Sequence, residues 1–436
     1  MPLAYVGWID AAWEGLDVNC MKNIKCSLSA AAVCLSLLHT ASAAIIGTGD
    51  VSPTDPSTWT NDTQGHVGLS PSSTGAVTVF DGSHLLSRTC RIGSGIDATG
   101  TVDISGSEST WVCTDGLSVG YAGHGELSIV DGGVVSSLAY GDIGFESGAT
   151  GVVSVAGQGS TWDSIDELNI GGYGDGQLHI TDGGTASANT GYISRGAGSR
   201  GTVVVSNSGS TWNAQLLDVG KAGDGYLIVS SGGTVNSVTG YVGTYSLSKG
   251  VARVSGAGSR WSNSGDLTVG DDGDGQLSIA DEGLVVVGGE LAIDSDLDGD
   301  GSIRMGCSAM LAVAGDAGSS LAGFLDLIEG TDAIQFWDSA SSSWSTIVSA
   351  TPGADYTLEY HSDGDLTGCT VLTVISPWMP GDADLDSDVD LDDFVVLKQH
   401  FATGTTWCEG DFDVDGDVDL DDFVILKRNF GATTNP

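Results

Sequence analysis

A tryptophan recurs about every 50 residues through the first part of the chain. Successive members of this series are separated by 52, 51, 50 and 49 residues, and each follows Ser-Thr or Ser-Arg. The series is Trp59, Trp111, Trp162, Trp212 and Trp261. A fixed period in this range is typical of stacked repeats, in which neighbouring units together bury a core that no single unit could bury. The chain is therefore predicted to be a repeat protein, either a propeller or a solenoid.

Each unit divides into two halves of about 25 residues. The segment GELSIVDGG, from Gly125, resembles GVVSVAGQGS, from Gly151, and both alternate apolar with small polar residues, which predicts short strands. A propeller blade uses four antiparallel strands in about 40–50 residues, whereas about 25 residues suffice for a solenoid coil. We therefore predict a mainly β fold, a right-handed parallel β-solenoid (β-helix) over residues 44–304. The residues expected to face its interior include Leu127, Ile129, Val153 and Val155.

The composition agrees with many strands joined by tight turns. Gly accounts for 67 of the 436 residues and Pro for only 8. Glycine permits the sharp corners that a coil needs. The tryptophans are expected to be core residues of the coils, and the alternative is an exposed ladder on which sugar rings stack.

The charge excludes two classes of partner. The chain has 57 Asp and Glu residues but only 14 Lys and Arg, which gives a formal net charge of −43. A nucleic-acid partner needs a positive surface, and this chain repels phosphate. An anionic membrane surface is excluded for the same reason.

The repeats resemble those of autotransporter-associated and PEP-CTERM-associated secreted bacterial proteins. The resemblance rests on the G-S-x-W element, as in GSTW at Gly159, and on the paired segment LNIGGYGDGQLHITDGG that follows it. It covers roughly residues 59–290. It implies a β-helical surface protein without known chemistry.

Residues 1–43 have the pattern of an upstream extension followed by a secretory signal peptide, with Met21 as the expected start. Two lysines follow Met21, residues 28–38 are apolar, and a small-residue cleavage site ends at Ala43. A buried helix is the alternative interpretation. The mature chain is expected to begin near Ala44 and to be secreted, either extracellular or at the cell surface. No later stretch is apolar enough to predict a membrane span.

The repeat period is lost in residues 305–376, which still read as β-structure. We expect this segment to cap the solenoid, because an uncapped end would be an exposed sheet edge. Residues 377–380 are the predicted linker to a separate tail domain.

Two nearly identical acidic segments form this tail, GDADLDSDVDLDDFVVLK from Gly381 and GDFDVDGDVDLDDFVILK from Gly410. A twelve-residue calcium loop supplies oxygen ligands from positions 1, 3, 5, 7, 9 and 12, and aspartates occupy all six positions in both segments. The expected ligands of the first ion are Asp382, Asp384, Asp386, Asp388, Asp390 and Asp393. Those of the second ion are Asp411, Asp413, Asp415, Asp417, Asp419 and Asp422. A helix with one apolar stripe is expected after each loop.

This duplicated loop–helix unit looks like a type I dockerin domain over residues 381–431. The resemblance implies calcium-dependent docking onto a cohesin-like partner. The contacts that it implies here are Leu391, Asp392, Lys398, Leu420, Asp421, Lys427 and Arg428. Clostridial dockerins have small hydroxyl residues where these copies have Leu-Asp, which leaves the identity of the partner open. A third acidic segment, DSDLDGDGSI at Asp294, lacks the closing carboxylate and is expected to be a solenoid turn.

Three functions are compatible with these features. The first is a secreted, non-catalytic β-solenoid that attaches to a partner through a dockerin-like tail. The second is a polysaccharide-degrading enzyme, and the third a carbohydrate-binding protein that uses exposed aromatic residues such as Tyr121, Tyr173 and Tyr241. The acids recur with the turns and the seven histidines form no motif, so we predict that the chain is not an enzyme. Polysaccharide is kept as a second candidate partner.

Overall fold

The computed structural model describes residues 44–294, 300–329, 333–338, 343–375, 379–384, 388–404, 407–412 and 417–433. The predicted signal peptide lies outside these ranges, as do residues 377 and 378 of the predicted linker and residues 295–299 of the acidic segment at Asp294.

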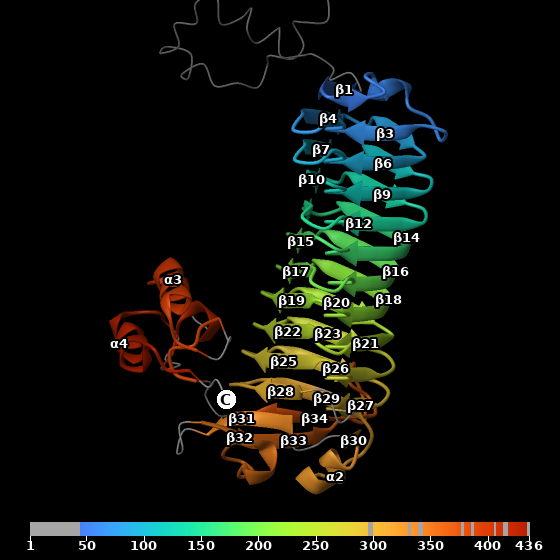
Figure 1. Cartoon of the computed structure of the whole chain (residues 1–436). Coiled ribbons are helices and arrows are strands. Elements are labelled where there is room, and N and C mark those ends of the chain that lie inside the picture. Colours follow the sequence, from blue (N-terminus) through green and yellow to red (C-terminus); the bar gives the residue numbers. More distant parts are fainter. Residues whose placement is uncertain are drawn as a thin grey trace, which may run out of the picture. The chain divides into compact units, whose positions relative to one another are not determined.

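Sheet A forms one side of the solenoid (Figure 1). It has 13 strands in the described chain, and each neighbouring pair from β4 to β31 is parallel. Its strands are β1 (Ala44–Gly49), β4 (Thr74–Phe80), β7 (Thr99–Ser105), β10 (His124–Val130), β13 (Thr150–Ala156), β15 (Asp175–Thr181), β17 (Arg200–Ser206), β19 (Asp224–Ser230), β22 (Lys249–Ser255), β25 (Asp274–Ala280), β28 (Gly301–Met305), β31 (Ile334–Asp338) and β32 (Ser343–Thr346).

Sheet B forms the other side, with 21 strands in the described chain. Most coils contribute two short strands to it, and in three coils the two merge into one long strand. The strands are β2 (Val51–Ser52), β3 (Gln64–Val67), β5 (His84–Ser87), β6 (Thr89–Ile92), β8 (Thr110–Cys113), β9 (Gly116–Val119), β11 (Val134–Ser137), β12 (Tyr140–Ile143), β14 (Thr161–Ile170), β16 (Thr185–Ile193), β18 (Thr211–Val219), β20 (Thr234–Ser237), β21 (Thr239–Val242), β23 (Arg260–Asn263), β24 (Leu267–Val269), β26 (Leu284–Val287), β27 (Leu291–Ile293), β29 (Met310–Ala314), β30 (Ile328–Glu329), β33 (Tyr356–Tyr360) and β34 (Cys369–Val374). The chain passes from one sheet to the other in each coil, so the fold is a β-solenoid of about ten coils. Its right-handed sense stays a prediction.

One coil takes about as many residues as one half-unit of the sequence. Gly100 is paired with Gly125, and Gly125 with Gly151, so these coils take 25 and 26 residues. A Cβ atom at Gly125 would lie 2.0 Å from the backbone nitrogen of Gly120, and only glycine fits so close an approach. The coil is therefore the structural counterpart of the half-unit.

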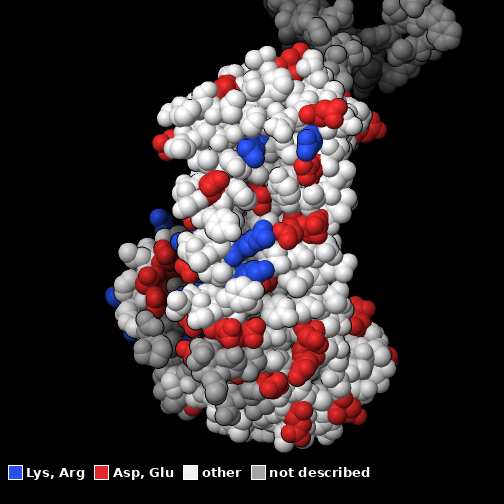
Figure 2. Space-filling view, turned by 45° about the vertical axis from the view of Figure 1, so that its right-hand side comes forward, with Lys and Arg blue, Asp and Glu red and all other residues white. Residues whose placement is uncertain are grey.

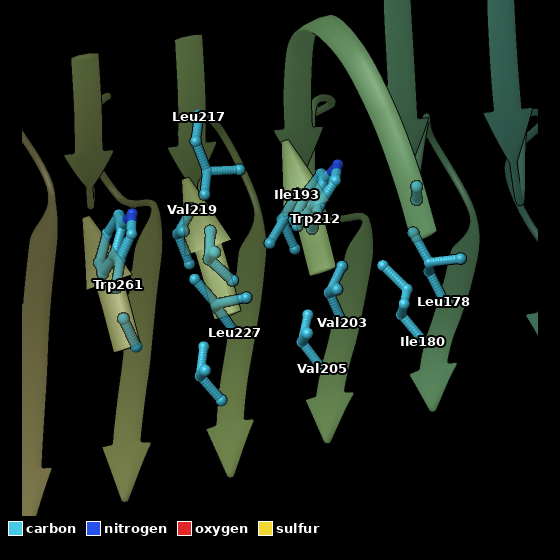
Figure 3. Packing of buried hydrophobic residues seen from close by; sticks show 14 of the residues in the cluster. Leu178, Ile180, Ile193, Val203, Val205, Trp212, Leu217, Val219, Leu227 and Trp261 are labelled. Atoms are coloured by element: carbon cyan, nitrogen blue, oxygen red, sulfur yellow. The ribbon is translucent and has the colours of Figure 1, made fainter. Parts of the chain in front are cut away.

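The core lies between the two sheets and runs through the coils. The four residues predicted to face inward from β10 and β13 are all buried. Figure 3 shows how side chains from sheet A, such as Leu178 and Val203, meet side chains from sheet B, such as Ile193 and Trp212. The inward-facing residues of the short alternating strands thus form one continuous core, as the solenoid interpretation requires.

The tryptophans form one column in sheet B. Trp111 and Trp162 are both paired with Val135, which lies on the strand between them. The same alternation continues to Trp212 and Trp261, with Ala186 and Val235 as the intervening residues. All four indoles are fully buried. They are core residues, and a sugar-stacking ladder made of these four is wrong because no ring face is accessible.

At each of the two ends of the solenoid, antiparallel strands follow the last parallel strands. At the first end β1 pairs antiparallel with β4, and β2 with β3, while the short helix η1 (Pro56–Thr58) precedes the buried Trp59. At the other end β34 pairs antiparallel with β29 and β33, and β32 with β31. The helices α2 (Leu321–Leu325) and η3 (Ile347–Ser349) belong to this second end. Such strands occupy edges that would otherwise offer unpaired backbone groups.

The tail contains the helices α3 (Leu391–His400), η4 (Trp407–Glu409) and α4 (Leu420–Asn429). Leu397 and Leu426, one from each long helix, are buried together with Val389 and Val418. The rings of Phe394 and Phe423 lie 6.0 Å apart. The two acidic segments are therefore held around a small shared core.

Candidate metal centre

The first acidic loop brings aspartates together around Asp393. Carboxylate oxygens of Asp382, Asp384 and Asp393 lie within 4.8 Å of one another. A second group with the same spacing consists of Asp388, Asp390 and Asp393. Five of the six predicted ligands thus belong to these two groups, which share Asp393, and the sixth, Asp386, lies outside the described residues.

The Asp393 carboxylate ties the start of the loop to the helix that follows it. Its Oδ1 accepts hydrogen bonds from the backbone nitrogens of Ala383 (2.7 Å) and Asp384 (3.2 Å), and its Oδ2 accepts one from Asp390 (2.7 Å). An ionised carboxylate accepts hydrogen bonds in this way, and the ionised form is also the one that coordinates a cation.

Helix α3 begins where the loop closes because of two aspartate side chains. Asp390 is its N-cap and accepts a hydrogen bond from the backbone nitrogen of Asp392 at 2.7 Å. Asp393 completes a reciprocal capping box with Asp390. Negative charge is stabilised at a helix N-terminus, which favours this placement of the acids.

The second loop repeats the arrangement. The Asp422 carboxylate accepts hydrogen bonds from the backbone nitrogens of Phe412 (2.6 Å) and Asp419 (2.8 Å). Asp419 caps α4 with φ −135° and ψ −153°, against −136° and −152° for Asp390 in the first loop. Asp413 and Asp415 lie outside the described residues, while Asp417 is exposed and Asp411 is buried.

Four loop carboxylates are almost completely buried, at positions 1 and 12 of each loop: Asp382, Asp393, Asp411 and Asp422. Burying an ionised carboxylate is costly unless it is paired or coordinates a metal. At position 12 of each loop, hydrogen bonds from backbone amides to the carboxylate offset part of this cost. The remaining donor set consists of oxygen alone, which suits a hard divalent cation and not a soft one.

The residues that the dockerin resemblance marks as docking contacts are accessible in both copies. Leu391 and Leu420 occupy the same position in the two helices and are each 66% exposed. The other members of the set are also exposed: Asp392, Lys398, Asp421, Lys427 and Arg428. Their role in docking stays a prediction.

The aromatic residues predicted for carbohydrate binding lie on the solenoid. The rings of Tyr121 and Phe145 are stacked with centroids 5.2 Å apart, and Tyr173 meets Phe145 edge-on at 6.4 Å. Two of the three predicted tyrosines are therefore brought near each other by a phenylalanine that sequence reasoning missed. The third, Tyr241, lies on β21, in another coil.

Two buried acids in sheet B were also missed. Burial raises the pKa of Asp142 to about 6, against a hydrogen bond from Asn169 that lowers it. Burial likewise raises the pKa of Asp218 to about 6, against a hydrogen bond from Thr244. Both lie inside strands, and their burial depends on residues of neighbouring coils, which the local sequence pattern does not reveal.

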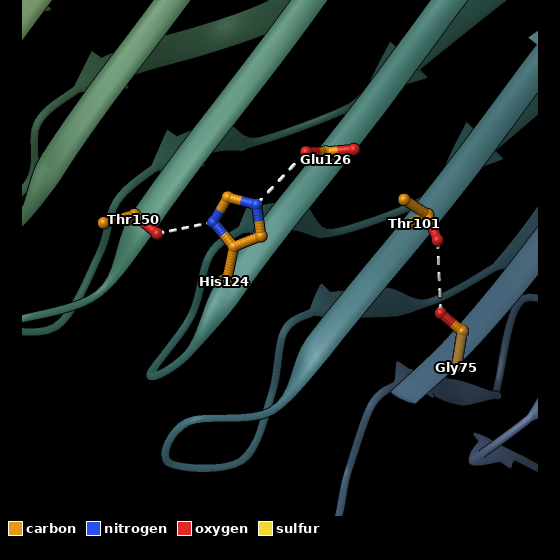
Figure 4. Close-up of polar contacts among 5 residues, drawn as sticks. All are labelled: Gly75, Thr101, His124, Glu126 and Thr150. Atoms are coloured by element: carbon orange, nitrogen blue, oxygen red, sulfur yellow. Dashed lines mark hydrogen bonds and ion pairs between the residues drawn. The ribbon is translucent and has the colours of Figure 1, made fainter. Parts of the chain in front are cut away.

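The side chain of His124, on β10, contacts neighbouring residues of sheet A. His124 Nδ1 lies 2.6 Å from Thr150 Oγ1 on the next coil, and its Nε2 lies 3.1 Å from Glu126 Oε1 (Figure 4). Nearby, Thr101 Oγ1 donates to the carbonyl oxygen of Gly75 at 3.5 Å. Such contacts between strands in register contribute to sheet stability.

The fold and the tail together define a parallel β-solenoid protein with an aspartate-rich helical tail. No family model matches the chain, and no solved structure matches it. One segment is similar to the uncharacterized lipoprotein YdeK of Escherichia coli strain K12, with 28% identity over 141 residues, which are 31% of this chain and 10% of that protein. Another is similar to the adhesin BmaC autotransporter of Brucella suis biovar 1, with 35% identity over 105 residues, 22% of this chain and 3% of that protein.

The chain thus spans a small part of the length of these relatives. An autotransporter adhesin and a lipoprotein, at low identity, agree with a β-helical protein of the cell surface or the extracellular space. No helix in the described part of the chain is long and apolar enough to cross a membrane.

Proposed function

We propose that this chain is a secreted, non-catalytic β-solenoid protein that attaches to a partner through a calcium-dependent, dockerin-like tail. The observation that supports the proposal best is the double group of carboxylates around Asp393, with its closing hydrogen bonds repeated at Asp422. A solvated acidic tail would not be expected to bury four carboxylates or to close two loops with matching hydrogen bonds.

Calcium is the cation that fits this set. Ca²⁺ takes six to eight oxygen ligands, while Mg²⁺ demands a smaller octahedral shell and keeps several waters. In the first loop the ion would be held by the predicted aspartates, with Asp393 closing the site. When bound, it would neutralise charge that the loop otherwise concentrates in a small volume.

Attachment is assigned to the exposed ends of α3 and α4. Leu391 and Leu420 each present a large apolar side chain beside an aspartate at the first turn of a helix. Because the two copies have matching cap geometry, either copy could present the same contact set to one partner. A partner with an apolar patch near basic groups would complement this surface.

The solenoid is proposed to be the part that the tail anchors. Acidic side chains are spread over the face seen in Figure 2, whereas basic ones are few. This agrees with the exclusion of nucleic acid and anionic membranes as partners. A cell-surface or extracellular site is supported by the signal-peptide pattern and by the similarity to an adhesin and a lipoprotein.

The test is binding of the mature chain to a panel of purified cohesin domains in calcium and in EGTA. We expect one or more domains to bind in calcium only. The double variant Leu391→Ser/Leu420→Ser should lose binding while it still takes up calcium. Each single variant should keep it, because the other copy remains. Binding that persists in EGTA, or no binding by any domain, would reject the docking proposal.

A further inference from the structure

A hollow of 440 Å³ opens on sheet B where outward-facing residues of neighbouring coils line up. Arg91, Ser118, Asp142 and Asn169 are in register on β6, β9, β12 and β14. All four line the hollow, together with the stacked rings of Tyr121 and Phe145. The hollow therefore combines aromatic rings with planar polar groups, the mixture typical of a small-molecule site.

One residue that lines this hollow, Asn169, has a buried hydrogen-bond acceptor that is not used within the described chain. Its Nδ2 donates to Asp142 Oδ1 at 2.9 Å, but its buried Oδ1 has no hydrogen-bond partner among the described residues. A buried acceptor without a partner costs on the order of 1–3 kcal/mol. Because Asn169 is only 1% exposed and lines the hollow, a hydroxyl group placed there would supply the missing donor.

The rings supply the second half of the site. The Tyr121 and Phe145 planes are inclined by only 16°, and the guanidinium of Arg91 lies 3.9 Å from the Tyr121 centroid. Aromatic rings bury apolar area while neighbouring polar groups fix orientation. A sugar ring has both kinds of surface, C–H groups for the edges of the aromatic rings and hydroxyls for the polar groups.

The charges of the hollow select a neutral ligand. Arg195 is engaged with Glu167 at 3.1 Å, and Arg91 lies over Tyr121. An anionic ligand would meet Asp142, Asp166 and Glu167 in the lining, on a chain whose net charge is −43. A cationic ligand would meet the two guanidinium groups.

A longer groove of 780 Å³ adjoins the hollow along the same sheet. Residues 163–165 of β14 line the groove, and residues 166 and 167 of that strand line the hollow. The groove continues from β14 to β26, which is five strand spacings or roughly 24 Å. Uncharged amides mark its course, with Asn236 Nδ2 donating to Asn213 Oδ1 at 2.9 Å. Its length fits an extended chain of several sugar units.

We infer that the hollow and the groove form one binding site for an extended, neutral polysaccharide. One sugar unit lies along the edges of the stacked Tyr121 and Phe145 rings, with a hydroxyl donating to Asn169 Oδ1. The following units run along the amides of the groove. The inference does not depend on the tail.

The test is calorimetric titration of the mature chain with cellohexaose, xylohexaose and mannohexaose, and with hexagalacturonate as the acidic comparison. We expect at least one neutral hexasaccharide to bind. Tyr121→Ala and Asn169→Ala should each weaken it at least tenfold, about 1.4 kcal/mol. The control is Tyr360→Ala, which removes a 40% exposed tyrosine in β33 and should change nothing.

Two further variants separate the parts of the inference. Gln215→Ala, in the groove, should weaken the hexasaccharide but not the matching disaccharide. Asp393→Asn, in the tail, should leave sugar binding unchanged, so failure of the metal proposal cannot be confused with failure of this one. Thermal unfolding of each variant verifies that it folds. The inference is overturned if no neutral hexasaccharide binds, if only hexagalacturonate binds, or if folded Tyr121→Ala binds like the unmodified chain.

Discussion

The indole of Trp212 lies directly over Gly191 on the neighbouring coil. A Cβ atom at Gly191 would be only 2.7 Å from Trp212 Cζ2. A Cβ atom at Gly240 would be 3.1 Å from Trp261 Cζ2 and 2.5 Å from Asn263 Oδ1. The Gly-Tyr pairs at 191 and 240 therefore recur with the same period as the tryptophans, because the lack of a side chain at each glycine leaves space for an indole.

This contact predicts that Gly191→Ala destabilises the solenoid although it adds one methyl group. Overpacking a filled core costs typically about 1–3 kcal/mol. Chemical unfolding monitored by circular dichroism should show a loss of this size. In the background of Trp212→Leu the same glycine substitution should cost much less, because the obstructing ring is gone. Equal costs in both backgrounds would mean that the indole is not the cause.

The hydrogen bond of one tryptophan gives a second prediction. Trp261 Nε1 donates to Ser237 Oγ at 3.1 Å, and the same hydroxyl group bonds to Asn263 Oδ1. Ser237→Ala should cost about 1–3 kcal/mol, since it leaves buried polar groups unsatisfied. Ser137 is the matched control, because it is buried in the corresponding strand and its hydroxyl has no partner among the described residues. Ser137→Ala should be neutral or slightly stabilising in the same unfolding measurement.

The third prediction concerns pH and Asp218. Burial raises its pKa from 3.8 to about 6, so between these values the folded state binds the proton more tightly than the unfolded state. Its contribution to stability is therefore favourable at low pH and is lost as pH rises through 6. Relative to that of the unmodified chain, the free energy of unfolding of Asp218→Asn should rise by on the order of 1–3 kcal/mol from pH 4 to pH 8. Asp224→Asn removes an exposed acid and should parallel the unmodified chain.

Local patterns were sufficient to predict some of these features and insufficient for others. Alternation within a strand identified Leu127 and Val153 as core residues, because the two faces of a strand differ in burial. The site around Asp142 could not be found in this way. It joins residues from coils about 25 positions apart, and an isolated acid at an outward strand position is indistinguishable from a solvated one until the register is known. The loop of Asp393, by contrast, is contiguous, so the spacing of its aspartates is visible in the sequence itself.

The tail gives the last prediction, that calcium supplies much of its folding free energy. The first loop places several carboxylates close together, and without a cation each close pair repels by about 1–4 kcal/mol at effective dielectrics between water and a protein surface. Its core is small, with Leu397, Leu426 and a few neighbours, and offers little to offset that repulsion. Binding to a site that forms only on folding stabilises the folded state directly.

We therefore expect calorimetry of the mature chain to give two calcium ions, and EGTA to make the tail sensitive to protease while the solenoid stays resistant. Asp393→Asn and Asp422→Asn remove the closing carboxylates of the first and second loop and should each lower the stoichiometry to one ion. Each should also weaken the remaining site, because α3 and α4 share a core through Phe394 and Phe423.

Asp392→Asn is the control, since this exposed acid precedes position 12 and is not a predicted ligand. Mg²⁺ should substitute poorly because it prefers a smaller shell. A tail equally protease-resistant in EGTA would falsify the coupling of calcium to folding, and an unchanged stoichiometry in Asp393→Asn would remove that residue from the site.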